Sequence, residues 1–241
     1  MSRREGWELR AARRFRTARR MPPTALFDLD GTLVDSAPDI HAAADRMAAR
    51  LGLRRYARAE IVGMIGDGVR ALVERALAAR GRAFDEMAYQ AFLADYAANT
   101  AVETAPFPGI PAALDALAAS GWRLAICTNK PEGATRALLA AIGLADRFAA
   151  IGAGDTFPVR KPDPAHLRAT LEAAGGEAAR AVMIGDHRND VVAAVGAGIP
   201  CIFAAWGYGT AAMAEGAAAV AVHPGEVPVL CGRLLAAPAT A

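Results

Sequence analysis

The spacing of apolar and polar residues changes along the chain, and these changes predict its strands and helices. Short apolar runs, each closed by glycine or polar residues, are typical of buried strands. They lie at residues 24–28, 122–128, 148–153, 181–185, 201–205 and 217–222. After residue 110 these runs alternate with helical segments, one of which is opened by Asp163 as N-cap and Pro164 as first residue. Such alternation predicts an α/β fold, a Rossmann-like parallel sheet with helices on both faces.

Between the first and second predicted strands the pattern is helical throughout. Apolar residues recur at helical spacing, as in residues 69–77, and β-branched runs are nearly absent. This stretch of about 65 residues is too long for a simple crossover connection. The chain is therefore predicted to contain a core, residues 21–37 and 104–241, and an inserted all-helical domain, residues 38–103.

Charge is unevenly distributed along the chain. The net charge is +2, but residues 1–20 contain eight arginines and two glutamates, so they carry +6 and residues 21–241 carry −4. A basic arm for nucleic acid, a membrane-surface arm and an Arg-rich targeting peptide are three interpretations of this segment. We favour a fourth, a plain extension ahead of a domain that begins near Met21. No nucleic-acid or membrane partner is then expected.

Composition and cysteine usage point to a cytoplasmic globular protein. Hydrophobic residues make up 54% of the chain and charged residues 22%. No run of 18 uncharged apolar residues occurs, and the N-terminus lacks the apolar stretch of a secretory signal. Cys127, Cys201 and Cys231 show no metal-binding spacing, so reduced thiols in the cytoplasm are the simplest interpretation.

Chemically active side chains follow the predicted strands. In open parallel sheets ligands bind at the carboxyl ends of the strands, so these side chains are expected to share one edge. They are Asp28, Asp30, Thr128, Asn129, Lys161, Asp186 and Asp190. So many carboxylates predict a hard divalent cation with oxygen ligands, Mg²⁺, and the added charge of Lys161 suits a phosphoryl group. Each short motif alone could be a turn, a cap or a solvated lysine, but together and in this order they favour catalysis.

At these residues the sequence resembles the haloacid dehalogenase superfamily, in its phosphatase branch. The stretches "DLDGT", "TN", "KPDP" and "GDHRND" look like its four motifs in order, and the helical insertion resembles its type 1 cap. The resemblance covers residues 24–235. More narrowly, "DLDGTLVDSAPD", "IGDGVRALVERAL", "CTNKP" and "GAGDTFPVRKPDP" fit the bacterial phosphoglycolate phosphatases.

The resemblance implies roles for the reacting groups. Asp28 would attack phosphorus to give an aspartyl-phosphate. Asp30 would protonate the departing alcohol and then activate water. The Thr128 hydroxyl and Asn129 would hydrogen-bond the phosphoryl oxygens, and Lys161 would offset the negative charge of nucleophile and phosphate.

The resemblance also implies how Mg²⁺ is held. Asp28 and Asp186 would supply carboxylate oxygens, and Asp30 would supply its backbone carbonyl. Asp190 would hold metal-bound water or orient Lys161.

Two further features extend the candidate site. Gly66, Asp67, Gly68 and Arg70 are candidate substrate contacts, because cap loops in this family reach into the site, although they could merely open a helix. His187 stands where the phosphatase pattern usually has serine. An imidazole that titrates near neutral pH would perturb the pH dependence of catalysis.

These expectations combine into Mg²⁺-dependent hydrolysis of a small phosphorylated substrate by a monomer or homodimer. The resemblance implies 2-phosphoglycolate, but a sugar phosphate, an amino-sugar phosphate or pyrophosphate would present the same phosphoryl group. Dehalogenation is disfavoured, because Asp30 would have no leaving alcohol to protonate, and the cap shows no reason for a phosphomutase to retain its intermediate. A non-catalytic binding protein on this fold would be expected to lack Asp28 or Asp30.

Overall fold

The computed structural model describes residues 21–236. The basic segment of residues 1–20 and the C-terminal residues 237–241 lie outside the described residues. Within residues 21–236, none of the helices combines the length and the apolar character needed to cross a bilayer.

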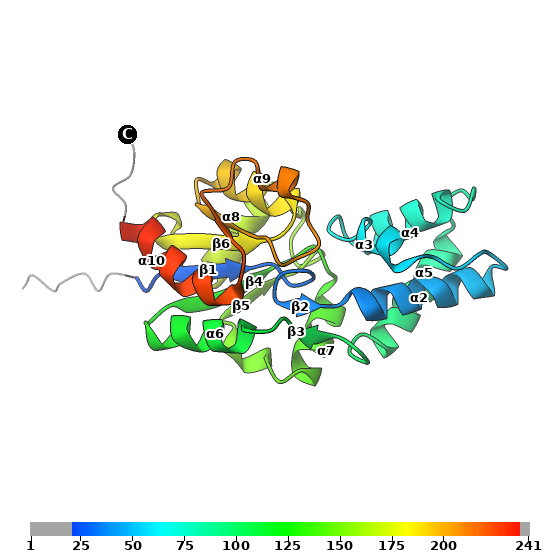
Figure 1. The fold of residues 1–241 in the computed structure, drawn as a ribbon, viewed down its shortest axis with the longest axis horizontal. Coiled ribbons are helices and arrows are strands. Elements are labelled where there is room, and N and C mark those ends of the chain that lie inside the picture. The colour runs from blue at the N-terminus through cyan, green and yellow to red at the C-terminus, as the bar shows by residue number, and fades with distance from the viewer. Residues whose placement is uncertain (1–20, 237–241) are drawn as a thin grey trace, which may run out of the picture.

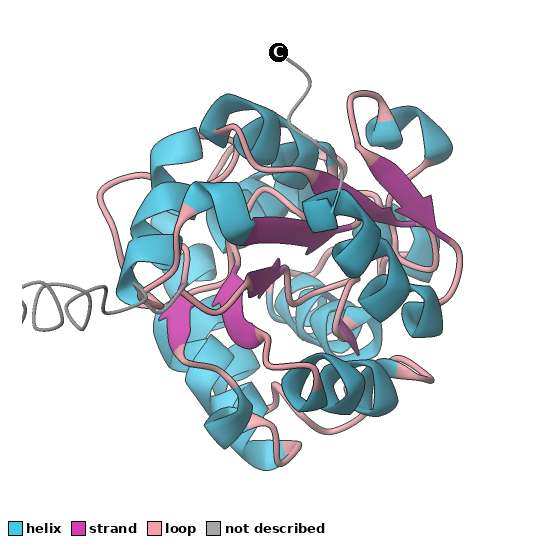
Figure 2. Ribbon diagram, turned by 90° about the vertical axis from the view of Figure 1, so that its left-hand side faces the viewer, coloured by secondary structure: helices cyan, strands magenta, loops and turns pink. Residues whose placement is uncertain are grey.

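A six-stranded sheet forms the centre of the larger part of the molecule (Figure 2). Its order is β5-β4-β1-β6-β7-β8, and every neighbouring pair is parallel. The strands are β1 (Thr24–Phe27), β4 (Arg123–Cys127), β5 (Ala150–Gly152), β6 (Ala181–Gly185), β7 (Cys201–Ala204) and β8 (Ala219–Ala221). The chain runs outward from β1 through β4 and β5, and then continues with β6 on the other side of β1. Such a reversal of strand order is where open α/β sheets bind ligands.

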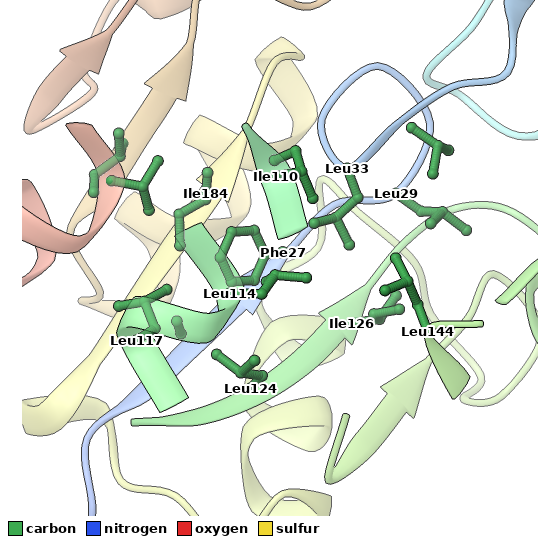
Figure 3. Close-up of a cluster of buried hydrophobic side chains, with 14 of the residues drawn as sticks. Phe27, Leu29, Leu33, Ile110, Leu114, Leu117, Leu124, Ile126, Leu144 and Ile184 are labelled. Carbon is green, nitrogen blue, oxygen red and sulfur yellow. The ribbon is translucent and has the colours of Figure 1, made fainter. Parts of the chain in front are cut away.

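Alternate residues of the strands pack on opposite faces of the sheet. Phe27 and Ile126 belong to the cluster on one face, where they meet Leu114 of a covering helix (Figure 3). Leu26 and Met183 belong to the cluster on the other face. Because both faces are covered, the strands are apolar at nearly every position, which is why the short apolar runs were recognisable in the sequence.

Five helices cover the two faces. The clusters assign α6 (Ile110–Ala119), α7 (Glu132–Ala141) and α10 (Val227–Ala236) to the face of Phe27, and α8 (Pro164–Ala173) and α9 (Arg188–Ala197) to the face of Leu26. The loops of the core contain four short 3₁₀ helices, η2 (Ala145–Arg147), η3 (Ala178–Arg180), η4 (Ala211–Ala214) and η5 (Pro224–Glu226). The α/β core with helices on both faces is confirmed.

Four helices form a second unit beside the sheet (Figure 1). They are α2 (Ala37–Arg50), α3 (Arg58–Val62), α4 (Val69–Ala78) and α5 (Glu86–Ala98). This helical unit, residues 37–98, has its own buried cluster, which includes Ile40, Ile61, Leu77 and Phe92. It lies beyond the carboxyl end of β1, so its loops face the edge where the chemically active side chains were expected.

Two chain segments join the helical unit to the sheet and lie side by side. β2 (Val34–Asp35) leads into the unit, and it pairs antiparallel with β3 (Ala105–Pro106), which leads out. The buried Asp39 carboxylate in the first turn of α2 accepts backbone N–H groups of residues 102–104 at 2.9–3.1 Å. The sequence analysis did not predict β2 and β3, because two-residue strands carry no hydrophobic periodicity.

Candidate active site

The two aspartates after β1 stand on a turn that the strand itself positions. The Asp28 N–H donates to the Ile184 carbonyl at 2.9 Å, so the ladder with β6 continues one residue past β1. Gly31 then adopts φ +86°, where a side chain would be strained, and its N–H donates to the Val34 carbonyl at 2.9 Å. Asp28 and Asp30 thereby line a cavity between the sheet edge and the helical unit.

Three buried carboxylates converge beside one lysine. Asp28, Asp186 and Asp190 each offer a carboxylate oxygen, and these atoms all lie within 4.8 Å of one another. The Lys161 ammonium lies 2.9 Å from Asp28 Oδ1 and 2.6 Å from Asp190 Oδ1. It also donates to the Cys127 carbonyl at 2.6 Å. Lys161 therefore neutralises only part of the charge of these three groups, which we call the acid cluster.

The rest of the acid cluster's charge is left uncompensated. Burial, with the nearby Asp28 and Asp190 carboxylates, raises the pKa of Asp186 to about 7. Burial likewise raises the pKa of Asp190, against the lowering effect of Lys161. Carboxylates that resist ionisation in a dry cluster of oxygen donors fit a hard divalent cation, which would stabilise their charged forms.

Two glycines pack closely against the Asp186 side chain, where a larger residue would not fit. A Cβ on Gly31 would lie 2.4 Å from Asp186 Oδ2, and one on Gly207 would lie 2.4 Å from Asp186 Cβ. With this close packing, the Thr32 hydroxyl donates to Asp186 Oδ1 at 2.7 Å and the Tyr208 N–H donates to Oδ2 at 2.8 Å. Both oxygens are therefore fixed toward the acid cluster.

Gly209→Ala is expected to disrupt this packing. Its Cβ would lie 1.7 Å from the Asp186 carbonyl oxygen, so the backbone that carries the carboxylate must move. We expect a loss of about 1–3 kcal/mol in the free energy of unfolding and weaker binding of a divalent cation. Urea denaturation and metal titration measure both.

Gly133→Ala is the matched control. A Cβ at Gly133, in the first turn of α7, meets nothing within 4 Å. This variant should be neutral or up to about 1 kcal/mol more stable. Equal behaviour of the two variants would contradict the packing role assigned to Gly209.

The Asp30 carboxylate lies outside the acid cluster and has partners of its own. Its Oδ1 accepts the Ser36 hydroxyl at 2.6 Å, and the Lys130 ammonium lies 3.0 Å from Oδ1 and 3.3 Å from Oδ2. Lys130 also donates to the Tyr96 hydroxyl of α5. The part of Asp30 in metal binding, expected through its backbone carbonyl, stays a prediction.

Thr128 and Asn129 follow β4 at the same edge and line the cavity. The Thr128 hydroxyl oxygen accepts the Lys130 N–H at 3.2 Å. The Asn129 amide donates to the carbonyls of Gly66 and Lys161 at 3.0 and 2.9 Å. Its amide hydrogens therefore join a loop of the helical unit to the core, and its expected hydrogen bond to the phosphoryl oxygens stays a prediction.

The loop of residues 66–68 reaches the site, but Arg70 does not. Gly66 and Gly68 line the cavity. Asp67 accepts the Asn189 amide at 2.6 Å and pairs with Arg75. Arg70 instead pairs with Glu86 at 2.7 Å and lies over the rings of Phe84 and Tyr89 on the helical unit, because these side chains are nearer on its own face. The structure thus brings three of the four candidate contacts to the core.

His187 acts as an N-cap. Its Nδ1 accepts the Asn189 N–H at 3.2 Å at the start of α9, a role that serine also fills. Burial lowers the pKa of the ring below its ordinary value, so the imidazole is neutral at pH 7. Its edge packs against Gly66, where a Cβ would lie 2.6 Å from the ring. The expected influence of His187 on the pH profile stays a prediction, and an unchanged pH–rate curve in His187→Ser would contradict it.

Several residues of the site were not predicted from the sequence. Lys130 follows the "TN" pair directly, so its position in "CTNKP" was an available signal. Thr32, in "DGT", was another. Tyr96 gave none, because it recurs at helical spacing with Phe92 like any core residue. Tyr208 is a further residue at this edge, and its hydroxyl donates to Asp35 and accepts the Ala37 N–H at the entrance to α2.

Comparison with known proteins defines the class of this site. Residues 25–204 match the family described as haloacid dehalogenase-like hydrolase. The chain belongs to the haloacid dehalogenase-like hydrolase family. The motifs stand in the order that the resemblance implies, and Asp28, Lys161, Asp186 and Asp190 from three of them meet at one edge of the sheet.

Proteins that are similar to this chain in sequence or in fold include phosphoglycolate phosphatases. A phosphoglycolate phosphatase from Cereibacter sphaeroides is 45% identical over 219 residues, which cover 89% of this chain and 100% of that protein. One from Rhodospirillum rubrum is 46% identical over 196 residues, 78% of this chain and 81% of that protein. The crystal structure of a predicted phosphoglycolate phosphatase from Haemophilus somnus superimposes with TM-score 0.80 at 26% identity, covering 86% of this chain and 97% of the other. CbbY from Rhodobacter sphaeroides, in complex with phosphate, gives TM-score 0.71 at 28% identity, with 86% and 96% covered.

Proposed function

We propose that this protein is a Mg²⁺-dependent phosphatase that hydrolyses 2-phosphoglycolate to glycolate and phosphate. One observation carries the chemistry: Asp28 lies in an acid cluster at the switch point of the sheet, with Asp30 two residues away facing the same cavity. The names of relatives that cover 89% and 78% of this chain support the substrate.

The proposed reaction assigns separate tasks to the two aspartates. Asp28 Oδ1 accepts the Leu29 N–H at 2.7 Å and pairs with Lys161, whereas Oδ2 has no hydrogen bond from the described part of the chain. Oδ2 attacks phosphorus, the bond from phosphorus to the glycolate oxygen breaks, and Asp30 protonates that oxygen. Asp30 then takes a proton from water as the water attacks the aspartyl-phosphate, which releases phosphate and restores Asp28.

The donor set favours Mg²⁺ as the cation. Carboxylate oxygens of Asp28 and Asp186 would hold it, with the backbone carbonyl of Asp30, and hard oxygen donors suit this ion. Asp190, whose Oδ1 lies 2.6 Å from the Lys161 ammonium, would orient that lysine beside the ion. When bound it would supply electrostatic stabilisation of the phosphoryl oxygens. The helical unit above the cavity would exclude water while the aspartyl-phosphate forms.

Stabilisation by Mg²⁺ is expected to grow with pH. The ordinary carboxyl pKa is about 3.9, and burial raises that of Asp186 to about 7 in the folded protein. Between these values the folded state holds the extra proton, so without metal the stability contributed by this group falls as pH rises through that window. Mg²⁺ binds the ionised form, so the rise in Tm that it causes over EDTA should be larger at pH 8 than at pH 5.5.

Asp186→Asn provides the control for this measurement. The neutral amide should remove most of the response to Mg²⁺ at pH 8. A response that is independent of pH, or one that the variant retains in full, would contradict the assigned metal site.

Phosphate release over a substrate panel tests the proposed function. The panel contains 2-phosphoglycolate, hexose phosphates, an amino-sugar phosphate and pyrophosphate, each with Mg²⁺ and with EDTA. The proposal expects metal-dependent turnover with the highest kcat/KM for 2-phosphoglycolate. Turnover led by another ester would keep the chemistry and overturn the substrate. No turnover in a folded protein would favour a binding protein.

A further inference from the structure

The cavity above the acid cluster has two chemically different walls. Its core wall carries Asp28, Asp30, Thr128, Asn129 and Lys130. The side chains that the helical unit contributes are apolar apart from one hydroxyl; they are Ile40, Ile65, Val69, Leu72, Phe92 and Tyr96. The cavity volume is about 40 Å³, so it suits a small ligand.

Among the described residues that line this space, Lys130 is the one cation. Its side chain is only 1% exposed, and its ammonium lies 4.5 Å from the centre of the Tyr96 ring. Among the described residues its three N–H donors face the two Asp30 carboxylate oxygens and the Tyr96 hydroxyl. Its charge is therefore balanced by Asp30 alone, and it becomes available to an anion in the cavity when Asp30 carries the proton that it gives to the departing oxygen.

We propose that Lys130 determines specificity by binding a carboxylate on the leaving group, so that the enzyme selects phosphate esters of small hydroxy acids. The inference rests on the proposed function, since it concerns the alcohol that leaves when phosphate is transferred to Asp28. Tyr96, on the helical unit, holds the ammonium toward the cavity and is a positioning residue.

The position of Lys130 matches the reaction. The oxygen that departs from phosphorus meets Asp30, and the Lys130 ammonium lies 3.0 Å from that carboxylate. A carboxylate one carbon away from the departing oxygen, as in glycolate, lies beside the ammonium. A longer chain would carry its charge past Lys130 into the apolar wall.

The apolar wall argues against polyhydroxylated substrates. The hydroxyl groups of a sugar phosphate would lie against Ile65, Leu72 and Phe92, which offer no hydrogen bonds. A buried polar group without a partner is strongly unfavourable, so sugar esters are rejected. Among the lining groups from the helical unit, the Tyr96 hydroxyl alone could serve them, and it already accepts from Lys130.

A pair of substrates isolates the carboxylate. Ethyl phosphate has the two-carbon skeleton of 2-phosphoglycolate but no carboxylate, so the ratio of the two kcat/KM values measures its recognition. We expect a large ratio in the wild-type enzyme, and a ratio lowered about 100-fold in Lys130→Met. Lys130→Arg should restore part of it, because it keeps the charge. Should the methionine variant fail to fold, Lys130→Gln gives the same comparison.

Lys161→Met is the matched variant, because Lys161 is the second buried lysine of the site but pairs with the acid cluster. It should lower both kcat/KM values alike and leave their ratio unchanged. A wild-type ratio of kcat/KM values near one, or a ratio that Lys130→Met and Lys130→Gln leave unchanged, would overturn the role proposed for Lys130. Neither result would contradict the proposed phosphatase function. A wild-type enzyme that prefers a hexose phosphate to 2-phosphoglycolate would overturn the proposed substrate together with the role of Lys130.

Discussion

Asp28→Asn is expected to lower kcat by on the order of 10⁴-fold or more. The amide has the shape of the carboxylate but cannot attack phosphorus. It can still accept the Leu29 N–H that Asp28 Oδ1 accepts at 2.7 Å, so the turn after β1 should persist. Steady-state phosphate release, with circular dichroism to verify folding, measures the effect.

Asp163→Asn is the control for this substitution. Asp163 caps α8 by accepting the Ala165 N–H at 2.8 Å, and asparagine caps a helix equally well. Its activity should stay within about twofold of the wild-type value. Asp28→Asn that kept more than a hundredth of wild-type activity, with no deamidation detected by mass spectrometry, would exclude Asp28 as the nucleophile.

Lys161→Met is expected to damage both stability and turnover. The ammonium is 1% exposed and pairs with Asp28 and Asp190 at 2.9 and 2.6 Å, so its removal leaves buried carboxylates uncompensated. Breaking such a buried pair costs about 3–5 kcal/mol in the free energy of unfolding. The loss of charge stabilisation beside the phosphoryl position should lower kcat about 100-fold or more.

Urea denaturation in EDTA measures the stability effect, and Mg²⁺ should recover part of it. The control is Arg136→Met, which removes an exposed ion pair with Glu132 within α7. Exposed helical pairs contribute only about 0.3–0.5 kcal/mol, so this variant should stay near wild type. A Lys161→Met protein as stable as Arg136→Met would contradict the view that the acid cluster depends on Lys161.

The sequence predicted the core of this fold because both faces of its sheet are covered. Strands such as β1 and β6 are apolar at nearly every position, and Asp28 and Asp186 follow them where the runs end. Since parallel strands end at one edge, placing residues at strand ends was enough to bring the acid cluster together. The position of the acid cluster could therefore be predicted without knowing where each side chain points.

Contacts between the helical unit and the core could not be predicted in this way. Their formation depends on how the unit sits over the sheet, which no local periodicity encodes. Tyr96 therefore resembled a core residue, and Arg70 was expected at the site although Glu86 and two aromatic rings bind it elsewhere. The contacts of Lys130 join both parts of the molecule, because its ammonium lies between Asp30 of the core and Tyr96 of the helical unit.

The central claim is that phosphate passes through a covalent bond to Asp28. Rapid acid quenching of the enzyme with 2-phosphoglycolate and Mg²⁺, followed by peptide mass spectrometry, tests it most directly. The account predicts one phosphoryl group on the peptide that contains Asp28 in the wild-type protein, and none there in Asp28→Asn. Glycolate formation in the wild-type enzyme with the phosphoryl group on another residue would contradict it.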